Sequence, residues 1–277
     1  MCTFVCGSII SEAGTYELFV YDIDADAIRR LPVQGDAVNP IWMPDGRAVV
    51  YGNINSVAAE RLVLRRVDGG DAGATLFQAK ERGEYVCPCS VGPDGKWVLG
   101  REVARDRQHP RLIAVSTGEP PEVRPLFDGE GDIGEASLSP DGRWIAAVML
   151  DGGRTRIVVR ANPVAADAPA RAGVSATVTA QNGHGPIWSP DGTTLCFAEG
   201  RARIRAVDIR TEPALSISQP RDLFDWDTIG SASDYPGFTP DGKHMVFVLA
   251  SEEEARTTRI NFVLNWGQEL RAKLGSR

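Results

Sequence analysis

Residues 187–198 read Ile-Trp-Ser-Pro-Asp-Gly-Thr-Thr-Leu-Cys-Phe-Ala, a turn signature followed by an apolar run. The Pro-Asp-Gly tripeptide within it occurs five times, at residues 44–46, 93–95, 140–142, 190–192 and 240–242. Successive prolines are 49, 47, 50 and 50 residues apart. A fixed period of this size is typical of repeated supersecondary units. The chain is therefore predicted to be an array of similar modules.

Each tripeptide predicts a tight hairpin. Proline fits the second position of a type I turn because its ring fixes φ, and glycine fits the fourth position. Aspartate bonds to nearby backbone in such turns, so the five aspartates are interpreted as turn formers and not as ligands. An apolar strand follows each turn, as expected for the second arm of a hairpin.

The strand after each turn is apolar on both faces. Five residues after the proline stand Val49, Val98, Ile145, Leu195 and Met245. The next position holds Val50, Leu99, Ala146, Cys196 and Val246, and the one after it Tyr51, Gly100, Ala147, Phe197 and Phe247. A strand without a polar face must be covered on both sides, which predicts sheets stacked face to face.

Two more strands complete each repeat. A third strand begins at Arg61, Arg111, Arg156, Arg203 and Arg259, and residues 17–22 fill the same slot ahead of the first tripeptide. A more polar fourth strand, for example residues 27–31, leads back to the next tripeptide. Four short strands in each repeat predict the blades of a propeller.

The repeat resembles the PD40 (WD40-like) repeat of TolB-like propellers. The resemblance rests on Trp-Ser-Pro-Asp-Gly, the apolar strand after it and a later strand ending in Val-Asp or Tyr-Asp, and it covers nearly the whole chain. It implies an all-β, six-bladed β-propeller of bacterial type that binds proteins or small ligands and is not an enzyme. It also implies the periplasm, although residues 1–10 lack the basic region and cleavage site of a signal peptide.

The repeats predict one propeller over residues 1–264, with blades at about 1–39, 40–88, 89–136, 137–186, 187–236 and 237–264. The first blade lacks its innermost strand and the last its outermost one, so we expect that an upstream segment was lost or lies outside this chain. How the ring closes is left open. Residues 265–277 are predicted as a short helix and tail, because Asn265 and Gln268 fit a capping box. Residues 260–270 are also similar to the tail of propeller regions behind some bacterial serine/threonine kinases.

Composition limits the partners. The net charge of −7 argues against nucleic acid, which needs a basic face, and no apolar run is long enough to span a membrane. The chain is expected to be a monomer. The five cysteines are an odd number, and one residue separates Cys87 from Cys89, so neither a disulfide framework nor a zinc pair is predicted. No catalytic signature is present, and no cofactor is predicted.

The connections into the first strand of each blade form the predicted binding site. In a propeller they gather around one mouth of the central channel, and rigidly displayed loops are where binding usually occurs. We call the following the mouth residues: Asp36, Asn39, Glu84, Tyr85, Asp132, Glu135, His184, Asp234 and Tyr235. Converging carboxylates would concentrate negative potential. They could hold a hard cation such as calcium or receive a Lys or Arg from a partner.

A structural alternative stays open for these acids. The arginines that begin each third strand lie near the same rim, and exposed pairs between them and the acids would contribute little, roughly 0–1 kcal/mol each. The function predicted from the sequence is a non-enzymatic binding or scaffold module for a protein or small ligand. The alternatives are the sensor region of a kinase-type receptor and the accessory propeller of a prolyl-oligopeptidase-like hydrolase.

Overall fold

The structure is a computed structural model. It describes residues 4–10, 14–22, 24–54, 60–69, 73–80, 84–104, 109–127, 129–179, 182–200, 203–225, 237–239, 242 and 244–246. The mouth residues Asp234 and Tyr235 and the predicted C-terminal helix lie outside these residues. The chain divides into two compact units, residues 1–138 with 163–166 and residues 139–162 with 167–277. Each unit is described by itself.

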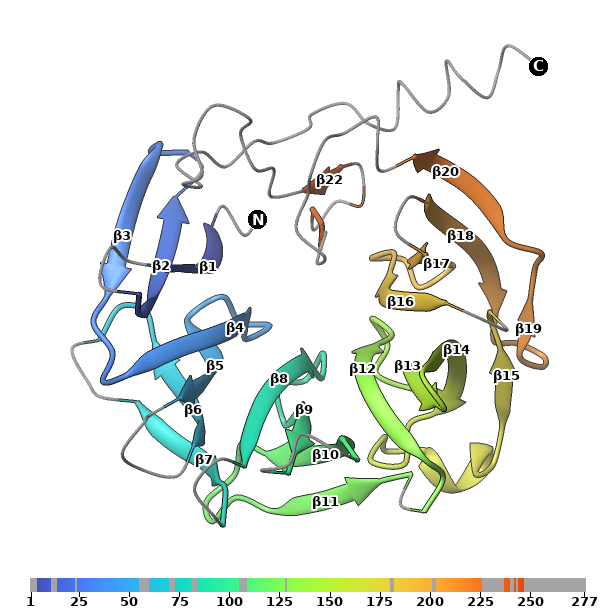
Figure 1. The fold of residues 1–277 in the computed structure, drawn as a ribbon, viewed down its shortest axis with the longest axis horizontal. Coiled ribbons are helices and arrows are strands. Elements are labelled where there is room, and N and C mark those ends of the chain that lie inside the picture. The colour runs from blue at the N-terminus through green and yellow to red at the C-terminus, as the bar shows by residue number, and fades with distance from the viewer. Residues whose placement is uncertain are drawn as a thin grey trace. The chain divides into compact units, whose positions relative to one another are not determined.

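The first unit is built of antiparallel meanders (Figure 1). A three-stranded sheet contains β1 (Phe4–Ile10), β2 (Tyr16–Asp22) and β3 (Ala27–Leu31). A four-stranded sheet follows, with β4 (Asp36–Trp42), β5 (Ala48–Ile54), β6 (Arg61–Arg66) and β7 (Ala74–Gln78). The next sheet has β8 (Tyr85–Val91), β9 (Trp97–Val103), β10 (Arg111–Ser116) and β11 (Val123–Leu126). The unit ends with β12 (Asp132–Leu138).

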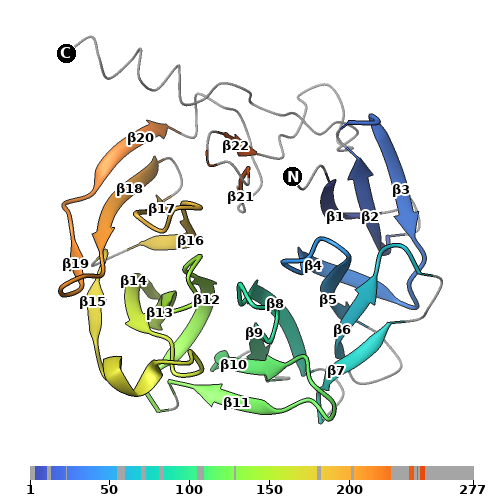
Figure 2. The same ribbon diagram turned by 180° about the vertical axis from the view of Figure 1, so that it is seen from behind.

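The second unit continues the same pattern (Figure 2). β13 (Trp144–Asp151), β14 (Arg154–Ala161) and β15 (Ser175–Thr177) follow β12 in one sheet order. β16 (Gly183–Trp188), β17 (Thr194–Glu199) and β18 (Arg203–Arg210) form the next sheet, in which β19 (Ser216–Ile217) and β20 (Arg221–Asp225) both pair with β18. A two-stranded sheet, β21 (Gly237–Phe238) and β22 (Met245–Val246), comes last among the described residues.

The Pro-Asp-Gly turns have the predicted geometry. In every copy the glycine N–H donates to the carbonyl of the residue before the proline, at 2.8–2.9 Å, so proline is second and glycine fourth in the turn. The carboxylates of Asp45, Asp94, Asp141 and Asp191 each accept the backbone N–H two residues on, at 2.9–3.0 Å. The interpretation of these four aspartates as turn formers is confirmed.

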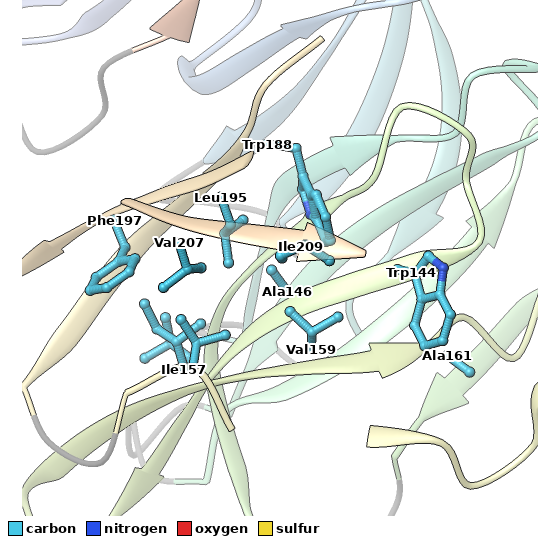
Figure 3. Packing of buried hydrophobic residues seen from close by; sticks show 12 residues of the cluster. Trp144, Ala146, Ile157, Val159, Ala161, Trp188, Leu195, Phe197, Val207 and Ile209 are labelled. Atoms are coloured by element: carbon cyan, nitrogen blue, oxygen red, sulfur yellow. The ribbon is translucent and has the colours of Figure 1, made fainter. Parts of the chain in front are cut away.

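The core lies between neighbouring sheets. Val49, Val98, Ile145, Leu195 and Met245, the residues five positions after each proline, all have 0% exposure. In the second unit, Trp144, Ala146, Ile157 and Val159 of one sheet pack against Trp188, Leu195, Phe197 and Val207 of the next (Figure 3). The prediction of strands covered on both faces is therefore confirmed, and it requires sheets stacked face to face.

Successive turns also touch one another. A Cβ added to Gly192 would lie 3.6 Å from Cδ of Pro140, and one added to Gly242 would lie 3.4 Å from Cδ of Pro190. Each glycine has a φ near 70°, at 72° and 67°, a region in which side chains are strained. In these two repeats a larger residue in place of the glycine would therefore lie against the proline of the preceding tripeptide.

An Ala- and Pro-rich stretch connects β14 and β15. Its second half, Asp167–Arg171, lies against the turn of its own sheet and contains the short 3-10 helix η1 (Ala168–Arg171). Asp167 pairs with both Arg171 and Arg143, and the Arg171 guanidinium lies 5.8 Å from the centre of the Trp144 ring. The Arg171 side chain thus lies over the Trp144 ring, and Trp144 is 3% exposed.

Candidate functional site

The first strands of successive repeats place the mouth residues. Within the first unit β4 lies beside β8 and β8 beside β12. Their first residues are Asp36, Tyr85 and Asp132, each half-buried. The structure thus places these three at the starts of strands and not in the connections before them, where the sequence had them. At the far end of the same strands, the Leu138 N–H donates to Ser90 Oγ at 3.1 Å.

Among the described residues, register shifts typical of β-bulges occur in three of the first strands, β4, β8 and β16. The register shifts between Val38 and Ile41 in β4, between Pro88 and Ser90 in β8, and between His184 and Ile187 in β16. Asn39 sits in the first bulge with a φ of 50° and is exposed. Bulges bend a strand and turn side chains away from the regular alternation, and they are frequent beside functional sites. Asn39 is therefore displayed by an irregularity of its strand.

Asp36 connects two sheets of the first unit. Its Oδ1 accepts the backbone N–H of Tyr16, the first residue of β2, at 2.9 Å. The carboxylate of Asp36 thus accepts a hydrogen bond from the backbone of the preceding repeat, at the first residue of β2. Hydrogen bonds from a backbone N–H to a carboxylate are among the stronger ones in proteins.

Asp132 makes the equivalent connection two sheet pairs further on. Its Oδ1 lies 3.1 Å from Nδ1 of His109, which precedes β10, the third strand of the preceding sheet. The Ile133 N–H donates to the carbonyl of Pro110 at 2.8 Å, so backbone and side chain join the same two segments. The pair is exposed to solvent, since the His109 side chain is 82% exposed and that of Asp132 is 34% exposed.

Asn53 holds the connection that leads to Asp36. Its side chain is 1% exposed, and its Nδ2 donates to the carbonyls of Gln34 and Asp36 at 2.7 and 3.2 Å. Its Oδ1 accepts from Nη2 of Arg61 at 2.9 Å. A buried amide with all of these bonds made rigidifies the segment that it joins. Asn53 is therefore the residue that positions Asp36.

Three arginines of the third strands, Arg61, Arg111 and Arg205, bond within their own sheets. Arg61 bonds Asn53, its cross-strand neighbour, and Arg111 pairs with Glu102, its cross-strand neighbour, at 2.6 Å. In the second unit Glu199 faces Arg203 in the register and pairs with Arg205 at 2.9 Å. Asn53, Glu102 and Glu199 each stand nine residues after the proline of their repeat. This acceptor position was missed in the sequence, although aligning the repeats on the proline reveals it.

Three further mouth residues lie on or just before first strands. Glu84 is half-buried and precedes β8, and Glu135 is the fourth residue of β12, as Asn39 is of β4. His184 is the second residue of β16 in the second unit, at the start of its bulge. His184 thus stands one position further along its strand than Asp36, Tyr85 and Asp132 do along theirs.

The thiols beside this region are protonated. Burial raises the pKa of Cys89 to about 12, against the opposing charge of Arg101, and burial also raises the pKa of Cys87. Cys87 faces Arg101 across the β8–β9 register. The thiolate is the nucleophile and the metal ligand, so two protonated thiols are better described as small apolar side chains.

Charge is divided unevenly along the chain. Residues 1–138 carry 21 acidic and 14 basic side chains, whereas residues 139–277 carry 16 of each. The whole net charge of −7 therefore belongs to the part of the chain that contains Asp36, Glu84, Asp132 and Glu135.

The described residues contain no group of three or more His, Cys, Asp or Glu side chains arranged to hold a metal ion. Within the same part of the chain, no helix has the length and hydropathy of a membrane span.

Comparisons with known proteins identify the fold. The chain superimposes on TolB from Acinetobacter baumannii with a TM-score of 0.69 and 18% identity, over 90% of this chain and 59% of that one. The β-propeller domain of Myceliophteria thermophila Cps50 (Swd1) gives 0.63 and 12%, over 94% and 82%. An oligogalacturonate lyase in complex with manganese gives 0.61 and 15%, over 91% and 69%. The chain thus spans less than two thirds of the Acinetobacter TolB.

No protein-family model matches the sequence. A search of curated proteins also finds no match. The class of protein follows from the sheets and the structural neighbours together: the chain is all-β and has the TolB-like β-propeller fold, as the repeats predicted. At identities this low the likeness shows the fold alone, because one fold carries many functions.

Proposed function

We propose that this propeller is a non-enzymatic binding module that recognises a protein or small ligand through its mouth residues. The observation that carries the proposal is the recurrence of polar residues at the starts of adjacent first strands, Asp36, Tyr85 and Asp132, each on a rigid sheet. Side chains displayed by well-packed elements lose little entropy on binding, which favours recognition.

The proposal gives different mouth residues different tasks. Asp36 and Asp132 bond to the preceding repeat and fix the shape of the surface. Asn39, exposed in its bulge, and Tyr85 are the contact residues. Tyrosine supplies a large amphipathic contact area and is enriched in interfaces. The excess of carboxylates in residues 1–138 favours a partner that presents Lys or Arg.

The test compares two variants of the whole chain in affinity capture from a bacterial lysate, followed by quantitative mass spectrometry. The double variant Asn39→Gly and Tyr85→Ser removes two contact side chains, and glycine preserves the positive φ of residue 39. The control variant Arg66→Gln and Asp68→Asn removes an exposed ion pair between the last residue of β6 and the connection that follows it. The proposal expects a partner that the mouth variant loses and the control retains. A partner set shared by all three proteins would contradict it.

The non-enzymatic part is tested separately, because one structural neighbour is an oligogalacturonate lyase in complex with manganese. Incubation with oligogalacturonate and manganese should leave the chain length of the substrate unchanged. Cleavage that persists in material purified to homogeneity would overturn this part of the proposal while leaving the binding surface to be judged by the capture experiment.

A further inference from the structure

The first sheet of the chain has three strands, whereas the next sheet has four. β1 pairs with β2 in a register that sets Ser8 opposite Leu18, as β5 pairs with β6 in a register that sets Gly52 opposite Leu62. β1 therefore corresponds to the second strand of a repeat. β5, β9, β13 and β17 each pair with a first strand on their other edge. β1 instead ends its sheet order, and no described residue continues the sheet beyond it (Figure 1).

The first strands, which end the later sheets, carry features that prevent further pairing. Pro40, Pro88 and Pro186 lie at the register shifts of β4, β8 and β16, and β12 carries Glu135 near its middle. Proline has no N–H to offer a further strand, and charges and bulges also protect an edge. β1 contains no proline and no charged residue, and its seven residues pair with β2 without a register shift. Its open edge is therefore regular and lacks these protective features.

One polar atom of β1 has no partner. Ser8 Oγ is buried, and no hydrogen-bond partner for it exists among the described residues. The equivalent residue in the next sheet is Gly52, which lies opposite Val38 of the first strand β4. A Cβ at Gly52 would lie 3.0 Å from a Val38 methyl group, so a side chain at this position meets the first strand of a complete sheet. A buried hydroxyl without a partner costs free energy, and an additional strand can supply that partner.

We propose that the open edge of β1 binds an extended segment of a partner polypeptide, which adds a strand antiparallel to β1 in the place of a first strand. The later sheets show what covers the equivalent edge, since β4 and β8 pair antiparallel with β5 and β9. In strand addition the backbone hydrogen bonds give affinity, and the side chains that enter pockets give specificity.

The repeats also specify the side chains of the added segment. The second residue of three first strands is apolar and 0%, 2% or 1% exposed: Ala37, Val86 and Ile133. The seventh residue of the same strands is apolar as well: Trp42, Val91 and Leu138. The partner segment should therefore carry apolar residues at its second and seventh positions. This surface contains none of the mouth residues, so the inference goes beyond the proposed function and is tested independently of it.

The probe is a fluorescent synthetic peptide with the sequence of residues 132–142, which contains a first strand and its turn. Fluorescence anisotropy with the full chain should show saturable binding, and hydrogen exchange measured by NMR should locate it. Successive amides of an antiparallel strand point to opposite edges. In β1, the amides on the open edge should gain at least about ten-fold in protection when the peptide is bound, while those that face β2 keep theirs.

Two N-methylated peptides distinguish strand addition from apolar adsorption. One carries methyl groups on the backbone nitrogens of residues 133, 135 and 137, and the other on those of residues 134, 136 and 138, so each blocks one edge of the peptide. One of them should lose at least about ten-fold in affinity, because its hydrogen bonds to β1 are blocked, and the other should bind as the parent peptide does.

Three results would overturn the proposal. The first is an equal change of affinity in the two methylated peptides, which indicates adsorption without strand pairing. The second is the absence of binding at about 1 mM peptide. The third is full protection of the open-edge amides of β1 before any peptide is added, because the chain itself would then fill this edge.

Discussion

The carboxylate of Asp36 accepts the backbone N–H of Tyr16 at 2.9 Å, and this bond joins the first strand of one repeat to the third-strand slot of the repeat before it. Replacing Asp36 by Ala should lower the free energy of unfolding by about 1.5–3 kcal/mol, the range for a hydrogen bond to a charged group. Denaturant unfolding measures this. Asp36→Asn retains the acceptor oxygen and should recover at least half of the loss; an equal loss in both variants would show that the bond is not responsible.

Asn53 is buried and satisfies two carbonyls and an arginine, so removing its amide leaves polar groups without partners. We expect Asn53→Leu, which is close in volume, to cost about 2–3 kcal/mol of stability. Asn53→Asp keeps an acceptor for Arg61 but sets a carboxylate oxygen against the Gln34 and Asp36 carbonyls, so its cost should be at least as large. Chemical denaturation ranks the three proteins, and hydrogen exchange at Asp36 should rise in both variants.

Gly52 permits a close approach of two sheets in the first unit. A Cβ at this position would lie 2.8 Å from the Val86 carbonyl oxygen and 3.0 Å from a Val38 methyl group. Gly52→Ala is therefore expected to destabilise the protein by about 1–3 kcal/mol through overpacking. Gly118, which has open space around it, is the matched position. Gly118→Ala should change the thermal midpoint by no more than a degree or two, and similar shifts in both variants would refute the steric explanation.

Burial raises the pKa of Cys89 and of Cys196 to about 12 in each case. The thiolate fraction at pH 8 is then on the order of a thousand-fold below that of an ordinary thiol. Native alkylation by iodoacetamide, resolved by peptide mass spectrometry, should be at least about a hundred-fold slower at these two residues than in the urea-unfolded chain. Comparable rates in the two states would show that the thiols are accessible.

Hydrogen bonds from Ser189 and Thr193 hold the pKa of the Asp191 carboxyl below its usual value. A depressed pKa contributes stability that is present above the unfolded-state pKa, near 3.9, and is lost as the pH falls through the folded-state value. The stability difference between the wild type and Asp191→Asn should therefore be constant from pH 8 to 5 and shrink toward pH 3. Urea titrations across this range measure it, and a difference that stays constant down to pH 3 would contradict the assignment.

The sequence predicted the strands well because the repeat samples each position five times. Val49 and its four counterparts were assigned to the core from their shared position, and all have 0% exposure. The turn aspartates were also assigned correctly, since Pro and Gly at fixed offsets leave one turn geometry. Here local rules and global packing agree.

The site was harder to predict, because its geometry depends on contacts between repeats. His109 directly precedes Pro110, and nothing within its own repeat indicates that it contacts Asp132, 23 residues later. The role of Asn53 was not predicted, because the equivalent positions in two other repeats hold glutamates, Glu102 and Glu199. What the three residues share is an arginine opposite them on the neighbouring strand. The sequence suggested that the mouth acids could pair with these arginines. In the structure Arg111 instead pairs with Glu102, which lies on the neighbouring strand of its own sheet.

The contact between Gly192 and Pro140 limits how such a chain can change in length. If each turn has to lie against the preceding turn, the number of residues from the proline to the end of the strand after it cannot change. A single insertion there would exchange the two faces of a strand whose faces both pack. Insertions are tolerated in the later connections, as the stretch between β14 and β15 shows. The spacings of 49, 47, 50 and 50 residues follow from this division. In an evolving gene, length should vary in the second half of each repeat and stay constant in the first.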